Sequence, residues 1–202
     1  MYTALRAASV TMVEYLRQQF AADPTLGPLF NPGVGGIMVV SLSSPQEMVG
    51  NDAEGVSVWL YRVVRDEERL NTPPERISPD QLRPTPLPLR LHYLVTGITN
   101  RQVQTGPETE QVLLGKVLQA FYDHPVLRGT DLADDFTGTT IEVTARLETL
   151  GLDQISLLWE GLEGSYQLCV SYEVSVVYIA TAREPAQISP VQVSLPQYGV
   201  IV

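Results

Sequence analysis

Two histidines, His92 and His124, are the side chains of this sequence best suited to acid–base chemistry near neutral pH. A catalytic triad would need one of them beside a nucleophile and a carboxylate. His92 lies within a strand pattern, and His124 ends a helix pattern, where the helix dipole favours a charged imidazole. We expect both histidines to be structural, and the sequence predicts no catalytic residue and no enzyme.

Metal and phosphate sites need residue patterns that this chain lacks. Cys169 is its single cysteine, and no His-x-x-x-His spacing accompanies it, which argues against a zinc site. Asp131, Asp134 and Asp135 could offer oxygen ligands, but their spacing does not match a calcium loop, and a solvated loop explains them better. Gly33–Gly36 precedes a strand pattern and lacks the Lys-Ser/Thr pair of a phosphate loop. The sequence therefore predicts no metal and no cofactor.

Composition narrows the class of protein. The chain of 202 residues has 13 Lys and Arg against 23 Asp and Glu, and its net charge of −10 argues against nucleic-acid binding. One cysteine cannot form an intramolecular disulfide, which fits a reducing compartment. The N-terminus lacks a signal-peptide layout, and no apolar run approaches the roughly 20 residues that span a bilayer. We expect a cytoplasmic protein without membrane insertion, or one that leaves the cell within a larger particle.

Apolar spacing predicts one α+β domain over residues 1–182, followed by an extended C-terminal arm over residues 183–202. Two main helices are expected to pack on a mixed, largely antiparallel sheet. The expected elements are the helix Thr3–Ala22, the strands Ile37–Ser43, Gly55–Val64 and Leu89–Thr96, the helix Thr109–Tyr122, the strand Ile141–Leu147, the helix Ile155–Leu162 and the strand Leu168–Ile179. Trp159 is expected to be buried, and alternation places Tyr172, Val174 and Tyr178 on one face of the last strand.

The segment Asp66–Pro88 is rich in proline, which fixes φ and removes backbone donors. We expect a long, stiff loop, and loops of this length are often functional. A plain hairpin excursion is the alternative. The residues of this loop that we expect at a protein interface are Pro73, Pro74, Pro79 and Pro84.

The C-terminal segment Gln187–Val202 has strand-like alternation after the domain is complete. Its apolar residues are Val191, Val193, Leu195, Tyr198, Val200 and Ile201. A free apolar strand is an aggregation hazard, so we expect this segment to be paired. It could close its own sheet, but pairing with a neighbouring chain is the interpretation that we favour.

Several short motifs between residues 87 and 179 resemble one known family. They are Pro88-Leu89, Tyr93-Leu94-Val95-Thr96, Leu113-Leu114-Gly115 with Leu118, His124-Pro125-Val126-Leu127, Leu157-Leu158-Trp159-Glu160-Gly161-Leu162 and Ser171-Tyr172. In this order and spacing they resemble the cap, or tail-terminator, proteins of phage-tail-like contractile injection systems. One departure is that Tyr166–Cys169 stands where the family would place an Arg-Pro-Ser type of turn.

This resemblance implies a non-enzymatic protein that forms a ring, expected to be a hexamer, at the distal end of a stacked tube and sheath. The implied partners are other copies of the chain and the tube and sheath proteins, with no nucleic acid. The particle would be released or docked on a membrane. The alternative function is an adaptor or binding module that links a tail-like particle to another component.

Overall fold

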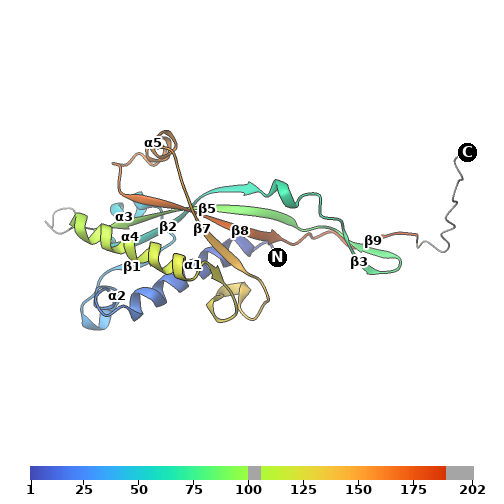
Figure 1. Ribbon diagram of the computed structural model, residues 1–202, viewed down its shortest axis with the longest axis horizontal. Coiled ribbons are helices and arrows are strands. Elements are labelled where there is room, and N and C mark those ends of the chain that lie inside the picture. Colours follow the sequence, from blue (N-terminus) through green and yellow to red (C-terminus); the bar gives the residue numbers. More distant parts are fainter. Residues whose placement is uncertain (100–105, 190–202) are drawn as a thin grey trace, which may run out of the picture.

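A six-stranded sheet runs through the centre of the molecule, with helices on both sides of it (Figure 1). The computed structural model describes residues 1–99 and 106–189. The helices are α1 (Ala4–Ala22), α2 (Gly27–Phe30), α3 (Pro45–Gly50), α4 (Gly106–Asp123) and α5 (Leu152–Gly161), with short 3-10 helices η1 (Pro32–Val34), η2 (Glu67–Arg69), η3 (Gly129–Asp131) and η4 (Asp134–Phe136). The strands are β1 (Val39–Ser41), β2 (Gly55–Arg65), β3 (Glu75–Ser78), β4 (Gln81–Arg83), β5 (Leu87–Ile98), β6 (Val126–Leu127), β7 (Val143–Glu148), β8 (Cys169–Ile179) and β9 (Ala186–Gln187). Among the described helices, none is long and apolar enough to cross a membrane.

The strand order of the central sheet is β1-β2-β5-β8-β7-β6. β1 is parallel to β2, and the other neighbouring strands are antiparallel. The predicted α+β class with a mixed, largely antiparallel sheet is therefore confirmed. The domain boundary at residue 182 stays a prediction, although β8 ends close to it, at Ile179.

The helices α1 and α4 pack side by side on one face of the sheet, as their apolar spacing predicts (Figure 1). Met12, Leu16 and Phe20 of α1 are completely buried. The hydroxyl of Tyr93 lies 2.8 Å from the hydroxyl of Ser9, which ties the centre of β5 to α1. Burial of each large apolar side chain stabilises the fold by about 1.5–3 kcal/mol, so this layer supplies much of the core's free energy.

On the opposite side of the sheet, α3 packs against β2 and β5, and α5 projects from the same side (Figure 1). Trp159 is 4% exposed, so the predicted burial of this side chain is confirmed. The rest of α5 is more open, because Leu152 and Leu157 are 83% and 67% exposed. Trp159 therefore anchors a helix that otherwise packs lightly.

A β-bulge in β8 changes the predicted faces of the last strand. Leu91 pairs with Val174, whereas Leu89 pairs with Val177, so β8 has one more residue than β5 between these pairs. The extra residue reverses the alternation beyond Val174. Val177 is consequently buried in the core and Tyr178 is 42% exposed, so the prediction that Tyr178 shares a face with Val174 is wrong.

Candidate functional site

A narrow arm projects from one end of the central sheet (Figure 1). It consists of the hairpin β3–β4, which is inserted between β2 and β5, and of β9, which pairs with β4. Glu75 pairs with Arg83 across the hairpin, and their side chains form an ion pair of 2.9 Å. The hairpin alternative for the segment Asp66–Pro88 is therefore what the structure shows, with irregular segments on either side of the hairpin.

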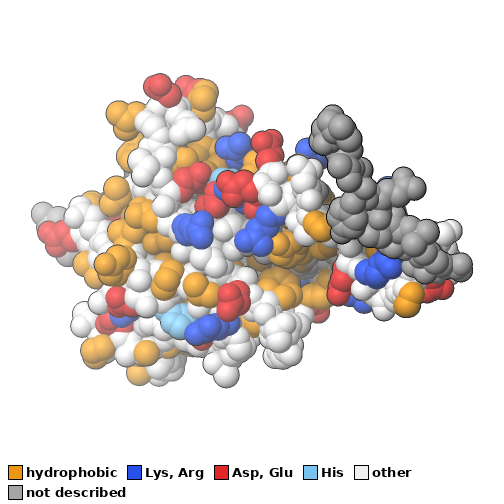
Figure 2. Space-filling model, turned by 45° about the vertical axis from the view of Figure 1, so that its right-hand side comes forward, with side chains coloured by type: hydrophobic (Ala, Val, Ile, Leu, Met, Phe, Trp, Pro, Cys, Tyr) orange, Lys and Arg blue, Asp and Glu red, His pale blue; other side chains and the backbone are white. Residues whose placement is uncertain are grey.

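Charged side chains hold the arm to the body. Asp66 is 1% exposed and lies 3.3 Å from Nε of Arg90, while Nη1 of Arg90 lies 3.6 Å from Glu173 of β8. Burial alone would raise the pKa of the Asp66 carboxyl. The hydrogen bond and charge of Arg90, together with backbone hydrogen bonds from Glu68 and Arg69, outweigh burial and hold this pKa below its usual value. Figure 2 shows charged side chains of both signs gathered on the body beside the start of the arm. This cluster fixes the position from which the arm departs.

The four predicted interface prolines all belong to the arm. Pro73 and Pro74 are exposed just before β3, Pro79 is exposed at the turn between β3 and β4, and Pro84 is half-buried after β4. The structure brings them together on one projection, and their contact with a partner stays a prediction. The other predicted interface residues, Val191, Val193, Leu195, Tyr198, Val200 and Ile201, lie outside the described residues.

The histidine in the sheet belongs to a buried polar cluster that contains a serine and a glutamate. Nδ1 of His92 and Oγ of Ser171 lie 3.1 and 2.8 Å from the same oxygen of Glu148, and the hydroxyl of Tyr61 lies 3.1 Å from Oγ of Ser171. In a catalytic triad the imidazole would contact the serine hydroxyl. Here the carboxylate lies between the two groups, so the cluster cross-links β2, β5, β7 and β8 without the geometry of a triad.

The carboxyl group of Glu148 is held ionised by this cluster. Burial would raise its pKa, but hydrogen bonds with His92, Ser171 and Tyr61 and the electrostatic interaction with His92 together outweigh burial, so the pKa of Glu148 lies below its usual value. Nε2 of His92 is buried, and no described residue gives it a hydrogen-bond partner. The spacing of residues in the sequence does not predict this cluster, because its members come from four separate strands.

The second histidine and the aspartates near it also make structural contacts. Nε2 of His124 lies 2.9 Å from a carboxylate oxygen of Asp131. Arg6 of α1 forms an ion pair of 2.7 Å with Asp134 and one of 3.5 Å with Asp135. These contacts fasten the segment after α4 to α1. Within residues 1–99 and 106–189, no group of three or more His, Cys, Asp or Glu side chains could hold a metal ion.

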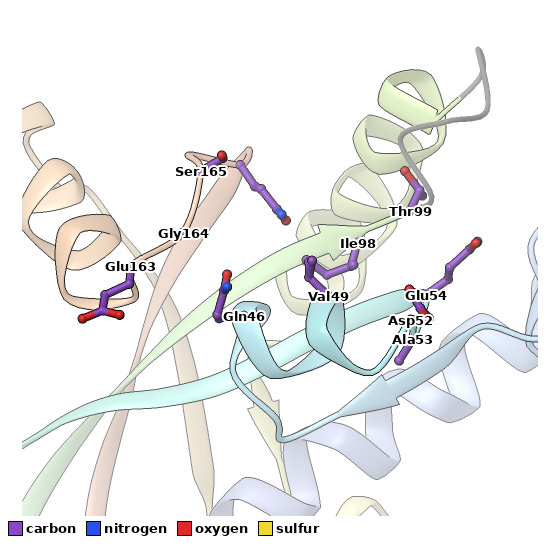
Figure 3. Close-up of a pocket in the computed structure, with 11 residues that line it drawn as sticks. Gln46, Val49, Asp52, Ala53, Glu54, Ile98, Thr99, Glu163, Gly164 and Ser165 are labelled. Atoms are coloured by element: carbon purple, nitrogen blue, oxygen red, sulfur yellow. The ribbon is translucent and has the colours of Figure 1, made fainter.

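A pocket of about 760 Å³ opens between α3 and the segment that follows α5 (Figure 3). Its lining includes the acidic residues Asp52, Glu54 and Glu163. Figure 3 shows the carboxylates of Glu54 and Glu163 on opposite sides of the pocket, directed away from each other. The pocket therefore lacks converging groups that could hold a cation or activate a substrate. Two of its acidic residues, Asp52 and Glu163, have φ angles of 51° and 52°, in the left-handed region that non-glycine residues seldom adopt.

Residues 8–193 match the family described as the Pvc16 N-terminal domain. The chain belongs to this family. The resemblance to cap and tail-terminator proteins is therefore confirmed. No curated protein matches the chain significantly.

Two solved structures share the fold of this Pvc16 N-terminal domain protein. One is the sheath/tube terminator of the extracellular contractile injection system PVC in its extended state, with 16% identity and a TM-score of 0.55. The match covers 100% of this chain and 65% of that one. The other is the tube-terminating cap of the anti-feeding prophage, with 17% identity, a TM-score of 0.50 and coverage of 79% of this chain and 53% of that one. The chain thus spans between half and two thirds of the length of these structures.

Proposed function

We propose that this Pvc16 N-terminal domain protein is a non-enzymatic structural cap that ends the inner tube and the sheath of a contractile injection particle. The observation that carries the proposal is the family match over residues 8–193. The two solved structures that share the fold of the chain, a sheath/tube terminator and a tube-terminating cap, support it. On this proposal the protein is made in the cytoplasm and becomes part of the assembled particle.

A cap has to end a stack of rings without extending it, and the projecting arm of this chain suits contacts within such a cap. A stack of rings leaves one unsatisfied interface at its growing end, and a terminator must match that interface without offering another. We propose that copies of the chain form a ring, expected to be hexameric, that contacts tube and sheath. The arm that contains Pro73, Pro74, Pro79 and Pro84 would lie at or near an interface between subunits. Proline stiffness supports this role, because a stiff arm loses less entropy when a neighbour orders it.

Omission of the chain from the particle tests the capping function. The tube and sheath proteins of the same particle are co-expressed with and without the full-length chain, and particle lengths are measured by electron microscopy. We expect a narrow length distribution and an end density with the chain, and a broad or unstable distribution without it. The same length distribution in both preparations would overturn the proposal.

An adaptor would give a different result in the same experiment. If particle lengths are unchanged but another component of the particle is lost when the chain is omitted, the chain connects that component rather than ends the tube. The native mass of the purified chain, alone and with tube and sheath proteins, gives the number of copies in the ring.

A further inference from the structure

An apolar groove of about 660 Å³ lies between α4 and β7, on the same face of the sheet as α1. Its lining is mostly apolar, with Leu118, Phe121, Tyr122, Ala145, Leu147 and Tyr172, and it also includes Pro125, Gln119 and Arg146. Tyr122 and Leu147 are 86% and 59% exposed, so two large apolar side chains at the groove contact solvent in the single chain. Exposed apolar surface that is hollowed and continuous is typical of a binding site.

The outer edge of β7 is open beside this groove. β6 pairs with Val143 and Thr144 of β7, and the backbone N–H of Ala145 donates to the carbonyl of Pro125 at 2.8 Å. Beyond this point none of the described strands pairs with the outer side of β7, up to its end at Glu148. Backbone groups alternate in direction along an antiparallel strand, so the N–H and C=O of Leu147 point outward as the N–H of Ala145 does.

The two surfaces of this edge differ in polarity. Ala145 and Leu147 face the groove. Arg146 also borders the groove, but the alternation of the strand directs its side chain and that of Glu148 toward the other face of the sheet, where Glu148 contacts Ser171. A strand that pairs here must therefore present apolar side chains to the groove and polar ones to the opposite face. Because β6 already occupies the neighbouring positions of the edge, such a strand has to be short and would continue the line of β6.

A short segment of this sequence has the required alternation of apolar and polar residues. Residues 191–195 read Val-Gln-Val-Ser-Leu, with proline directly before and after them. This is strict alternation of apolar and polar residues over five positions, which is typical of a half-buried strand. The flanking prolines cannot donate backbone hydrogen bonds and would limit pairing to this stretch.

The position of β9 favours a second copy of the chain as the donor of this strand. β9 pairs with β4, and the N–H of Ile188 donates to the carbonyl of Asp80 at 2.7 Å, so residues 186–188 are fixed on the arm. Figure 1 shows β9 on the part of the arm remote from α4. The whole arm therefore lies between β9 and the groove of the same chain, which favours the groove of a neighbouring copy.

We propose that residues 191–195 of one copy add a short strand to the free end of the outer edge of β7 in a second copy, with Val193 opposite Leu147 at the groove between α4 and β7. Gln192 and Ser194 then lie beside Arg146 and Glu148. Main-chain hydrogen bonds supply affinity, and the alternating side chains fix the register. The donor and acceptor surfaces are different, so the contact is head-to-tail and closes a ring when the rotation between copies allows it.

This contact rests on the proposed ring, and cysteine cross-linking tests it directly. One full-length chain has Leu147→Cys, the other has Val193→Cys, and both have Cys169→Ser to remove the native thiol. They are labelled with different isotopes, mixed, oxidised mildly and examined by intact mass. Side chains directly opposite each other on paired strands lie close enough for a disulfide, so we expect a mixed dimer.

Matched variants define the face and the register. Val191→Cys and Leu195→Cys are tested in the same way to allow for a shift of two residues. Gln192→Cys is the control, because its side chain faces away from the groove, and its yield with Leu147→Cys should be several-fold lower. Equal yields for positions 192 and 193, or no mixed dimer from positions 191, 193 and 195, would overturn the inference.

Two further measurements separate the possible occupants of the groove. A single chain with both Leu147→Cys and Val193→Cys, oxidised at high dilution, should not form an internal disulfide, and an internal disulfide would assign the strand to its own groove. Leu147→Lys should weaken self-association of the full-length chain, whereas Val112→Lys, at a 52% exposed position of α4 outside the groove, should not. If Leu147→Lys and the wild type associate equally while particle lengths stay normal, this contact is wrong and the capping function stands.

Discussion

The guanidinium of Arg17 donates two hydrogen bonds to the backbone carbonyl of Val40, with distances of 3.2 Å from Nε and 2.7 Å from Nη2. Val40 lies in the edge strand β1, and the N–H of the preceding Val39 donates toward β2, to the carbonyl of Glu54. The carbonyl of Val40 therefore points away from the sheet. α1 closes one edge of the sheet with a side chain, while the edge at Leu147 remains open, and this difference limits strand addition to one side.

Replacement of Arg17 should destabilise the fold and unblock β1. In Arg17→Ala the buried carbonyl of Val40 loses a charged donor, and we expect the free energy of unfolding to fall by about 1–2 kcal/mol. Urea denaturation at neutral pH measures this change. The control is Gln18→Ala, at an exposed position of the same helix, which should change the free energy by less than about 0.5 kcal/mol. Equal losses in the two variants would show that the contact with Val40 contributes nothing specific.

Trp159 should be the residue on which the position of α5 depends. It is the buried residue of a ten-residue helix whose outer leucines are largely exposed. Trp159→Ala should lower the free energy of unfolding by about 3–5 kcal/mol, because it leaves a large cavity under the helix. Thermal unfolding followed by circular dichroism measures the shift, and Leu157→Ala, at a 67% exposed position, is the control. An unchanged melting temperature in Trp159→Ala would contradict the observed packing.

Acid should destabilise the protein through Asp66 and Glu148. Burial opposes their ionisation, but hydrogen bonds and electrostatic interactions with the surrounding groups, Arg90 and His92 among them, together outweigh it, so both carboxyl pKa values are lowered in the folded chain. A carboxyl with a lowered folded pKa stabilises the fold fully above its unfolded pKa of about 4, and this contribution is lost as the pH falls through the folded value.

We therefore expect the free energy of unfolding to decrease as the pH is lowered from about 5 to about 2. Asp66→Asn should be less stable than the wild type at pH 7 and should lose less stability on acidification. Denaturant unfolding at a series of pH values gives both quantities. Glu67→Gln, next to Asp66 but exposed, should keep the wild-type profile. A wild-type slope in Asp66→Asn would mean that the ion pair with Arg90 carries none of the acid sensitivity.

The main helices and strands were predictable because side-chain periodicity is a local property of the chain. The apolar stripe of α1 and the alternation of β7 each reflect one face that the fold buries. The faces of β8 beyond Val174 were not predictable, because the bulge follows from the register between β5 and β8. The sequence predicts a loop for the arm, because its many prolines obscure the pattern of a polar hairpin with a turn at Pro79 and Asp80.

The interaction surfaces were only partly predictable for a related reason. The prolines of the arm predict an interface there. The ion pairs between Asp66, Arg90 and Glu173 are not predictable in this way, because they join three separate parts of the chain. Leu118 and Leu147 likewise become neighbours in the groove through the packing of α4 on the sheet. Sequence spacing carries no information on such contacts, which depend on the strand order.

Shortening the arm should weaken assembly while the body stays folded. A variant in which Pro74–Pro84 is replaced by an Asn-Gly turn removes β3 and β4 but keeps Asp66 and Arg90 at the base of the arm. The strands of the arm form their own three-stranded sheet, so the central sheet should keep its melting temperature. Sedimentation velocity should show fewer large assemblies than in the wild type.

A milder variant separates the arm's shape from its surface charge. Glu75→Ala removes the exposed ion pair with Arg83, which contributes at most about 1 kcal/mol, and should leave assembly unchanged.

The shortened arm also removes the partner strand of β9, so its effect includes misplacement of residues 191–195. Val193→Lys, which keeps the arm intact, measures the part that comes from the C-terminal strand alone. If the shortened variant still forms intact rings, the arm does not connect subunits, whatever the C-terminal strand contributes.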